Sequence, residues 1–316
     1  MRPLTFLLIL IILVVSFSLI PFGVSSYWVR FLSDIFMMAI LASSWNVIGG
    51  YTGYPSFGNV VFFGIGAYTT GVLMGKFSIP FFPSLLIAAL FAVIFAVLIG
   101  LPVLRLKGHY FAIATLGVAE AMREVVANLN ITEGNMGLTL PIYLNPNFFY
   151  YVMFGILVLT LLLTYWVTRQ RLGYGMVAIR EDEEAAAVAG VNTTQYKVIA
   201  FALSGIFTAM AGGVHAYYMT YIEPGPVFNV MITVEMIVMS IFGGVGTLLG
   251  PTVGAFIIEG LSELFSTYFL IIHALFFGAI VILAVIFTPR GLLDMLSGRR
   301  RFGLGYFLEN IRQNRV

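Results

Sequence analysis

Long apolar runs follow one another along almost the whole chain, and short polar or glycine-bearing segments separate them. Most runs approach the roughly 20 residues that a membrane-spanning helix needs. The pattern therefore predicts an all-α polytopic membrane protein with about ten transmembrane helices. We place them at residues 4–22, 31–49, 57–75, 82–102, 108–128, 148–168, 195–221, 229–248, 251–266 and 268–288.

Two of these runs have alternatives. The run at 4–22 follows Arg2 as the core of a signal peptide would, but it is long for one and no A-x-A site follows it, so we expect an uncleaved first helix. The segment 251–288 leaves almost no turn between its two helices, so 251–266 is either a full span or a short, re-entrant helix.

Composition agrees with a membrane protein. The chain is 60% hydrophobic and 9% charged, and its mean hydropathy is +1.00, whereas soluble domains are about 25% charged. A net charge of only +2 gives no reason to expect nucleic-acid binding, and the absence of cysteine excludes disulfides and thiolate metal sites.

Basic residues fix the expected orientation, because Lys and Arg accumulate on the cytoplasmic side of membrane proteins. With both termini in the cytoplasm, 13 of the 16 basic residues fall on that side, and only Arg30, Lys76 and Arg123 do not. We therefore expect one transmembrane domain over 1–296, with segment 169–197 as a cytoplasmic loop. The remaining residues, 297–316, form a basic cytoplasmic tail.

The loop 169–197 is predicted to contain a short helix. Acidic residues at 181–184 suit the positive end of a helix dipole, and the small residues Ala185–Ala189 follow them. Gly190 stands where a glycine commonly ends a helix, and Asn192 or Thr193 can cap the next one. Such a helix is either a solvated connector or a docking surface whose small side chains let another protein approach closely.

The same residues carry a resemblance. Glu184-Ala185-Ala186 followed by Gly190 is similar to the EAA-x-x-x-G coupling loop of ABC importer permeases. The wider phrases at 178–197, 104–116 and 287–293 resemble permeases that import branched-chain amino acids, in particular the M-type members of the high-affinity branched-chain amino acid permease family. The resemblance covers about residues 46–293.

This resemblance implies one of two related permease subunits of an ABC importer in a prokaryotic inner membrane. Its partners would be a second permease, two P-loop ATPase subunits that bind ATP, and an external substrate-binding protein. Coupling to the ATPases would rest on the loop residues that match the motif and its surroundings: Arg180, Glu181, Asp182, Glu184, Ala185, Ala186 and Gly190.

Two glycine-rich segments, 49–59 and 243–251, interrupt the apolar runs and cannot form regular helices throughout. Each is either a plain turn or a broken segment that lines a cavity and offers backbone groups to a substrate. The second alternative gives a candidate substrate pathway of Gly50, Tyr51, Gly53, Ser56, Phe57, Asn59, Thr115, Glu235, Gly243 and Gly244. The related permeases commonly have His where this chain has Asn59.

Acidic residues within apolar runs are functional candidates, because charges are unfavourable in a membrane. Glu120 and Glu124 lie beside Arg123, which suggests a partly internal ion pair. Glu235 could orient an ammonium group, carry a proton or hydrogen-bond a neighbouring helix, and Glu259 is a further candidate. No histidine has a second ligand at helical spacing, so we expect no metal site.

No lysine follows the G-x-x-x-x-G pattern of a phosphate-binding loop, and no catalytic motif is present. We therefore expect a transport subunit rather than an enzyme, without a cofactor of its own. Two alternatives stay open: an importer of urea or short amides from the same class, and a stand-alone secondary transporter that uses Glu235 or Glu259 as a proton or ion site.

Overall fold

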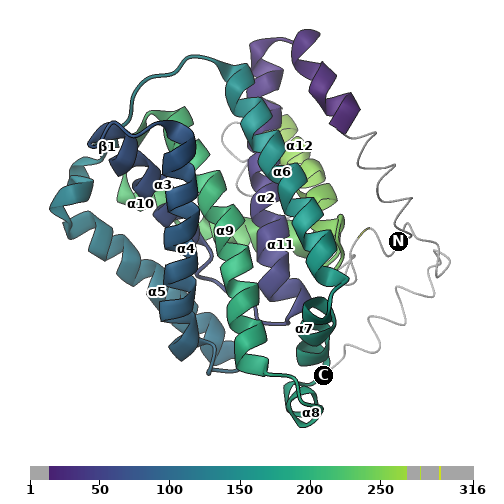
Figure 1. Ribbon diagram of the computed structural model, residues 1–316. Helices are drawn as coiled ribbons and strands as arrows, with labels where there is room; N and C mark the ends of the chain where they lie inside the picture. Colours follow the sequence, from purple (N-terminus) through teal and green to yellow (C-terminus); the bar gives the residue numbers. More distant parts are fainter. Residues whose placement is uncertain (1–13, 269–277, 279–291, 293–316) are drawn as a thin grey trace.

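The computed structural model describes residues 14–268 together with residues 278 and 292, and this part of the chain is mostly helical (Figure 1). The expected span at 268–288 and the tail from 297 lie almost wholly outside the described residues. The helices are α2 (Ser26–Asn46), α3 (Val60–Gly75), α4 (Phe81–Val103), α5 (His109–Asn128), α6 (Pro146–Thr168), α7 (Arg171–Glu181), α8 (Glu183–Val188), α9 (Thr193–Met219), α10 (Pro224–Val227), α11 (Val230–Gly243) and α12 (Gly250–Tyr268).

Shorter elements connect these helices. A π-helical turn, η2 (Val47–Tyr51), continues α2, and 3-10 turns occur at η1 (Ile20–Phe22), η3 (Asn130–Thr132) and η4 (Gly134–Met136). Two short strands, β1 (Leu138–Thr139) and β2 (Tyr221–Ile222), pair antiparallel.

Several helices have the length and composition of membrane spans, which confirms the predicted class of an all-α polytopic membrane protein. Among the described residues, five stretches are long and apolar enough to cross a membrane: Ser26–Tyr51, Phe81–Val103, Pro146–Thr168, Thr193–Met219 and Pro224–Gly243. The total of about ten helices and the orientation of the termini stay predictions.

Helix α9 is the centre of the bundle and packs against α2, α3, α4 and α6. Its closest approach is to α3. A Cβ atom added at Gly66 would overlap the carbonyl oxygen of Ala209, and one added at Gly212 would overlap that of Phe63. Two glycines, one on each helix, therefore let the backbones of α3 and α9 touch, as small residues commonly do between membrane helices.

The bundle has two distinct ends (Figure 1). At one end β1 pairs with β2, directly after the C-terminus of α9, and Leu138 is buried there. In the same loop Glu133 has a φ of +60°, a region that favours glycine. At the other end lie α7 and α8.

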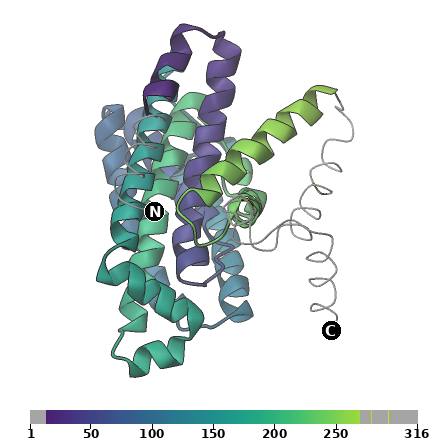
Figure 2. The same cartoon turned by 90° about the vertical axis from the view of Figure 1, so that its right-hand side faces the viewer.

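Helix α11 differs from the expected span at 229–248. It has 14 residues, which at about 1.5 Å per residue is shorter than the roughly 30 Å of a bilayer core, and it reaches the length of a candidate span only together with α10, as Pro224–Gly243. Figures 1 and 2 together show that α11 crosses the long helices instead of running beside them. Gly244 and Gly246, both at positive φ, then turn the chain into α12, which leans away from the bundle (Figure 2).

Candidate functional site

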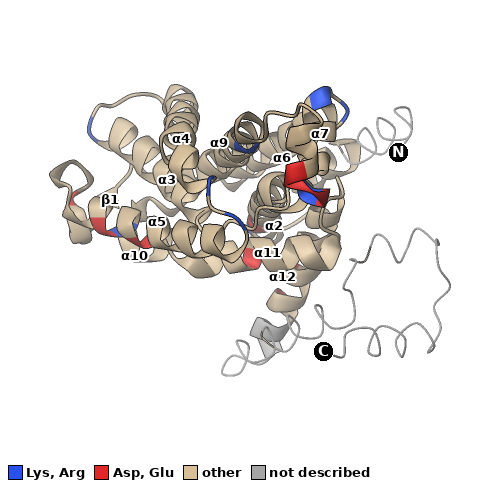
Figure 3. Cartoon of the chain, turned by 90° about the horizontal axis from the view of Figure 1, so that it is seen from below, with Lys and Arg blue, Asp and Glu red and all other residues tan. Residues whose placement is uncertain are grey.

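The segment predicted to hold one short helix contains two. Helix α7 ends at Glu181, and Asp182 then caps α8, since its side chain accepts hydrogen bonds from the backbone N–H groups of Glu184 (2.9 Å) and Ala185 (3.0 Å). Glu181 therefore belongs to the end of α7 and not to the start of the short helix. Acidic and basic segments gather around α7 at this end of the molecule (Figure 3).

The rest of the loop follows the prediction. Gly190, with a φ of +88°, comes directly after the cap of α8. The side chain of Asn192 accepts a hydrogen bond from the backbone of Gln195 and so caps α9. The segment therefore ends as its sequence indicates, with a left-handed glycine followed by a new helix.

Helix α8 has an inner and an outer face. Ala186 is only 4% exposed and packs among the residues beneath α8, whereas Val188 is 91% exposed. Ala185, Ala187 and Ala189 are exposed too. The small apolar face that is free to meet another protein is thus formed by these alanines and Val188, and the side chain of Ala186 faces the bundle.

Arg180, near the end of α7, reaches both glycine-rich segments. Its Nη1 donates a hydrogen bond to the carbonyl oxygen of Gly50 (3.2 Å), and the same guanidinium is paired with Glu181 (2.8 Å). A Cβ atom at Gly53 would lie 2.8 Å from Arg180 Cγ, and one at Gly246 would lie 2.6 Å from Nη1. Both segments therefore need glycine where the arginine passes between them.

Asn46, at the end of α2, joins the two glycine segments directly. Its amide Nδ2 donates to the carbonyl oxygen of Thr247 (2.9 Å), and its Oδ1 accepts from the backbone N–H of Gly246 (2.8 Å). The residue is 1% exposed. One buried side chain thus satisfies a donor and an acceptor of an irregular turn, which would be costly to leave unpaired.

The segment between η2 and α3 is a buried break in the bundle and not an exposed turn. Thr52, Ser56 and Asn59 are fully or almost fully buried. Side chains of other helices satisfy its backbone: Thr115 accepts from the N–H of Phe57 (3.0 Å), and Trp45 Nε1 donates to the carbonyl oxygen of Ser56 (2.8 Å). Irregular backbone is tolerated at membrane depth only under such conditions.

The start of α3 is held in the same way. Thr233 of α11 accepts from the N–H of Val60 (3.0 Å), and Asn59 Nδ2 donates to Ser204 Oγ of α9 (2.6 Å). Among the described residues Asn59 Oδ1 has no hydrogen-bond partner. The break is therefore tied to α5, α9 and α11 at once.

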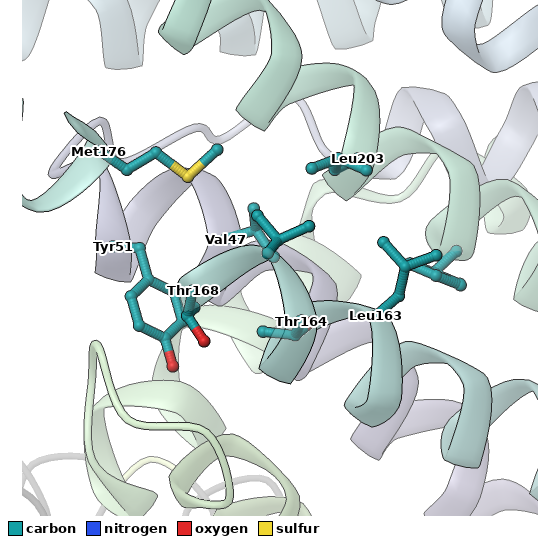
Figure 4. A pocket seen from close by; sticks show the side chains of 9 residues that line it. Val47, Tyr51, Leu163, Thr164, Thr168, Met176 and Leu203 are labelled. Carbon is teal, nitrogen blue, oxygen red and sulfur yellow. The ribbon is translucent and has the colours of Figure 1, made fainter. Parts of the chain in front are cut away.

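A small cavity adjoins the π-helical turn (Figure 4). It has a volume of about 10 Å³ and lies between η2, α6, α7 and α9, with Tyr51, Thr164 and Met176 in its wall. This volume is near the lower limit for one water molecule. π-helical turns are rare and occur frequently at functional sites, so this turn is counted with the candidate site.

A buried lysine connects α8 to the bundle. Lys197, near the start of α9, donates to Glu183 Oε1 (2.7 Å), to the carbonyl oxygen of Leu104 (2.8 Å) and to the hydroxyl of Tyr54 (3.1 Å). Its Nζ also lies 4.6 Å from the centre of the Tyr54 ring, and its side chain is 4% exposed. Tyr54 in turn donates to Glu183. We call Lys197, Glu183, Tyr54 and the Leu104 carbonyl the lysine cluster.

Charge and burial oppose each other at Glu183. Burial alone would raise the pKa of its carboxyl, but the hydrogen bonds from Lys197 and Tyr54 outweigh burial and lower the pKa below its ordinary value. On the outer side of α8, Lys107 pairs with Glu184 at 3.1 Å, and both side chains are largely exposed. The hydrogen bond with Glu184 raises the pKa of Lys107.

Most of the predicted pathway residues come together here. Gly50, Tyr51 and Gly53 lie around Arg180. The buried break is formed by Ser56, Phe57 and Asn59 together with Thr115 of α5. Gly243 and Gly244 lead into the turn that Asn46 holds. Glu235 lies apart on α11, partly exposed, and no hydrogen bond to it is found in the described part of the chain.

Three other features lie outside this site. The predicted pairs of Arg123 with Glu120 (3.0 Å) and Glu124 (3.1 Å) exist, and the three side chains are 40–64% exposed. A cavity of about 560 Å³ opens between α3, α4 and α5, and none of the predicted pathway residues lines it. No group of residues in the described part could hold a metal ion.

Sequence reasoning missed Asn46, Tyr54, Glu183 and Lys197 as site residues. A signal exists for one of them: Lys197 is one of three lysines in the chain and introduces a long apolar helix. A lysine at that place either reaches the membrane surface or finds an acidic partner.

Comparison with known proteins places this geometry in context. The family described as "Branched-chain amino acid transport system / permease component" matches residues 27–285. The chain is 30% identical to the high-affinity branched-chain amino acid transport system permease protein LivM of Escherichia coli K12, over 92% of this chain and 75% of that protein. It is 24% identical to LivH of the same organism, over 81% and 90%. It is also 26% identical to the fructose import permease protein FrcC of Rhizobium meliloti, over 71% and 61%.

Proposed function

Because the chain belongs to the family of permease components of branched-chain amino acid transport systems, we propose that it is a membrane-spanning permease subunit of an ATP-driven importer for these amino acids. It works with a second, related permease, two ATPase subunits and an external substrate-binding protein in a prokaryotic inner membrane. ATP is bound by the ATPase subunits.

The observation that carries this proposal is the connection of α8 to the two glycine-rich segments. The face formed by Ala185, Ala187, Ala189 and Val188 is exposed and apolar, as a docking surface for an ATPase needs to be. Behind it, Glu183 of α8 accepts a hydrogen bond from Tyr54 in the first glycine-rich segment, and Arg180 of the adjoining α7 donates one to the carbonyl oxygen of Gly50. A docking helix at one end of the bundle is thus joined by one hydrogen bond to a break in the transmembrane region.

This arrangement supports a mechanism of alternating access. When the ATPases close on ATP, α8 moves with them, and Arg180 and the lysine cluster transfer the movement to the segment after α2. Asn46 passes it to the turn at Gly246 and so to α11 and α12. Since both segments are irregular, they can change shape with less loss of hydrogen bonding than a regular helix.

An apolar cargo agrees with this site. The side chains of leucine, isoleucine and valine need no charged pathway, and backbone groups at helix breaks can bind the carboxylate and ammonium ends. The polar side chains that hold the end of the break, just before α3, are neutral amides and hydroxyls, among them Asn59, Ser204 and Thr115. The charged groups Arg180 and Lys197 contact earlier residues of the segment, Gly50 and Tyr54.

The test is uptake by the assembled transporter in vesicles. Val188→Trp, on the exposed face of α8, is expected to abolish ATP-driven uptake while the chain still inserts, because the bulky ring blocks the ATPase groove. Leu86→Trp, at an exposed apolar position on α4, is the matched control and should transport normally. Normal uptake by Val188→Trp would count heavily against a docking role for α8.

The fructose permease among the relatives gives a second candidate cargo class. Competition for uptake among leucine, isoleucine, valine, fructose and urea separates the candidates. Uptake that follows a proton gradient without ATP, and that Glu235→Gln abolishes, would instead favour the stand-alone secondary transporter.

A further inference from the structure

The cavity of about 560 Å³ between α3, α4 and α5 has the size of a binding site, since ligand pockets in proteins measure about 300–1,000 Å³. The three helices lie together on one side of the bundle (Figure 1). On α3 the wall of the cavity runs from Gly64 to Leu73, which is about 14 Å at about 1.5 Å per residue. The cavity therefore extends along the helices and is not a gap left by one side chain.

The wall of this cavity is almost wholly apolar. Only three of its described lining residues, Tyr68, Thr69 and Thr132, have polar side chains. The hydroxyl of Tyr68 is covered by protein, and that of Thr132 donates to the carbonyl oxygens of Val126 (2.6 Å) and Leu129 (2.8 Å). Neither ordered water nor the charged ends of an amino acid find enough partners there, so the cavity suits an apolar occupant.

The cavity is continuous with the exposed face of α4. Phe91, Ile94 and Leu98 line it and are 52%, 45% and 66% exposed. Helix α4 is one of the stretches long and apolar enough to cross a membrane, and these residues lie about 15–26 Å beyond its first residue, within the roughly 30 Å of a bilayer core. A molecule from the hydrocarbon region of the membrane can therefore enter the cavity along α4.

The opening is better suited to a lipid tail than to another helix. Membrane helices approach one another closely at small residues, but the side chains at the opening are bulky, among them Leu98 of α4 and Met122 of α5. The only glycine among the described lining residues is Gly64, and a Cβ atom there would overlap the ring of Phe228. No backbone is thus open to close contact, whereas a flexible acyl chain can follow such a wall.

One end of the cavity has an ion pair beside it. Lys76 and Glu133 are 3.3 Å apart, with side chains 31% and 48% exposed, and each directly adjoins a lining residue in the sequence, Phe77 and Thr132. Lys76 lies shortly before α4 begins at Phe81, and lysines near the ends of spans commonly reach the membrane surface. Exposed ion pairs contribute little, so both groups are available to a head group of mixed charge.

We propose that the cavity between α3, α4 and α5 binds one acyl chain of a membrane phospholipid, whose phosphate contacts Lys76 and whose amine contacts Glu133. The tail supplies contacts that the apolar wall otherwise lacks. Because Glu133 repels a head group with negative charge alone, the site prefers phosphatidylethanolamine to phosphatidylglycerol. The bound tail lies against α5, whose Thr115 holds the buried break. The proposal goes beyond the proposed function and is independent of the cargo.

The test is photolabelling of the assembled transporter in vesicles that contain phosphatidylethanolamine with a diazirine in the middle of its acyl chain. Label is expected on Leu73 and Met122, which are half-buried in the wall of the cavity, as well as on Leu86 and Leu90, exposed residues of α4 that surrounding lipid reaches. Label on Leu86 and Leu90 alone would overturn the proposal, because it would show that the cavity is empty or is covered by another subunit.

Substitutions separate a specific site from surrounding lipid. Ile94→Trp places a ring in the opening and is expected to abolish the labelling of Met122, whereas Leu90→Trp, one turn away and outside the cavity wall, should leave it unchanged. Unchanged labelling in Ile94→Trp, or equal loss in both variants, would overturn the proposal.

The head group is tested separately. Labelling of Met122 is expected to be stronger with phosphatidylethanolamine than with a phosphatidylglycerol that carries the same diazirine chain. Lys76→Gln should weaken the labelling and remove this preference, whereas Lys107→Gln, beside α8 at the other end of the bundle, should keep both. Equal labelling by the two lipids in the unmodified chain would overturn the roles given to Lys76 and Glu133.

Discussion

Replacing Lys197 by methionine tests whether the lysine cluster holds α8 to the membrane helices. The change keeps most of the side-chain length and removes the ammonium, which makes three hydrogen bonds at 2.7–3.1 Å. Glu183 then remains partly buried without its cation. Removal of one partner from a buried ion pair typically costs about 3–5 kcal/mol.

That free energy converts into a measurable opening of α8. Since each 1.4 kcal/mol is about a tenfold change in an equilibrium constant, we expect the opening equilibrium to rise by about two to three and a half orders of magnitude. Hydrogen exchange of the backbone amides of α8, measured in the assembled transporter in a bilayer, reports this quantity directly. Transport per ATP hydrolysed should fall in parallel, because α8 then moves without the bundle.

The chain contains its own control for this experiment. Lys107 pairs with Glu184, the neighbour of Glu183 on the same helix, but both side chains are largely exposed, and exposed ion pairs contribute little. Lys107→Met should therefore change exchange and coupling only slightly. Equal effects of Lys107→Met and Lys197→Met, or an unchanged exchange rate in the latter, would refute the reasoning.

A double mutant separates loss of the pair from loss of packing. Glu183→Gln combined with Lys197→Met removes the uncompensated carboxylate, so the double variant should be more stable than Lys197→Met alone. A double variant that is as unstable as the sum of both single changes would mean that the two residues act independently.

Three further outcomes follow from the structure. Because the folded-state pKa of Glu183 is lowered, the stability that Glu183 gives to the attachment of α8 to the bundle is present above the ordinary pKa of a glutamate and is lost as the pH falls through the lowered value. The rate of proteolysis within α8, measured as a function of pH, reports this loss. Gly66→Ala should destabilise the bundle by about 1–3 kcal/mol through overlap with α9, measured by thermal unfolding, while Gly155→Ala should not destabilise it. Asn46→Leu leaves the N–H of Gly246 unpaired and should cost about 1–3 kcal/mol; a variant as stable as the parent would show that the turn finds other partners.

The apolar pattern predicts helix positions well where burial in a membrane alone decides them. The runs at 82–102, 148–168 and 195–221 correspond to α4, α6 and α9 within two residues at each end. Long apolar runs in such a chain have only one stable conformation, because every backbone group must be satisfied within the segment. At α11 and the turn after it, glycines interrupt the apolar pattern, and the predicted run ends at 248, several residues beyond the observed end of α11 at Gly243.

The sequence pattern does not predict helix α7, because the formation of this helix depends on tertiary contacts. Its sequence contains Gly173 and Gly175, which favour no helix by themselves. In the structure a Cβ atom at Gly175 would overlap the ring of Tyr196, and one at Gly173 would overlap the end of α6. The glycines are there for close contact, a reason that a local reading cannot detect.

The hydrogen bonds of the site could not be predicted either, because they too depend on tertiary contacts. Arg180 and Gly50 are 130 residues apart, and Asn46 and Gly246 are 200 residues apart. Sequence patterns identify each glycine-rich segment as irregular, but a pattern of period 3.6 carries no information about which distant side chain completes its hydrogen bonds.

The motif at 184–190 contains residues that attach α8 to the bundle and residues that face outward, and the structure shows which are which. In a short helix, residues three apart share a face, so the burial of Ala186 follows from the anchoring of Glu183 by Lys197. The small side chain at 186 is needed on the inside, where α8 rests on the bundle, and the exposed residues that follow, above all Val188, are left to face outward. A bulky residue at position 186 would therefore detach α8 from the membrane helices before it could block a partner, and only substitutions on the outer face test docking itself.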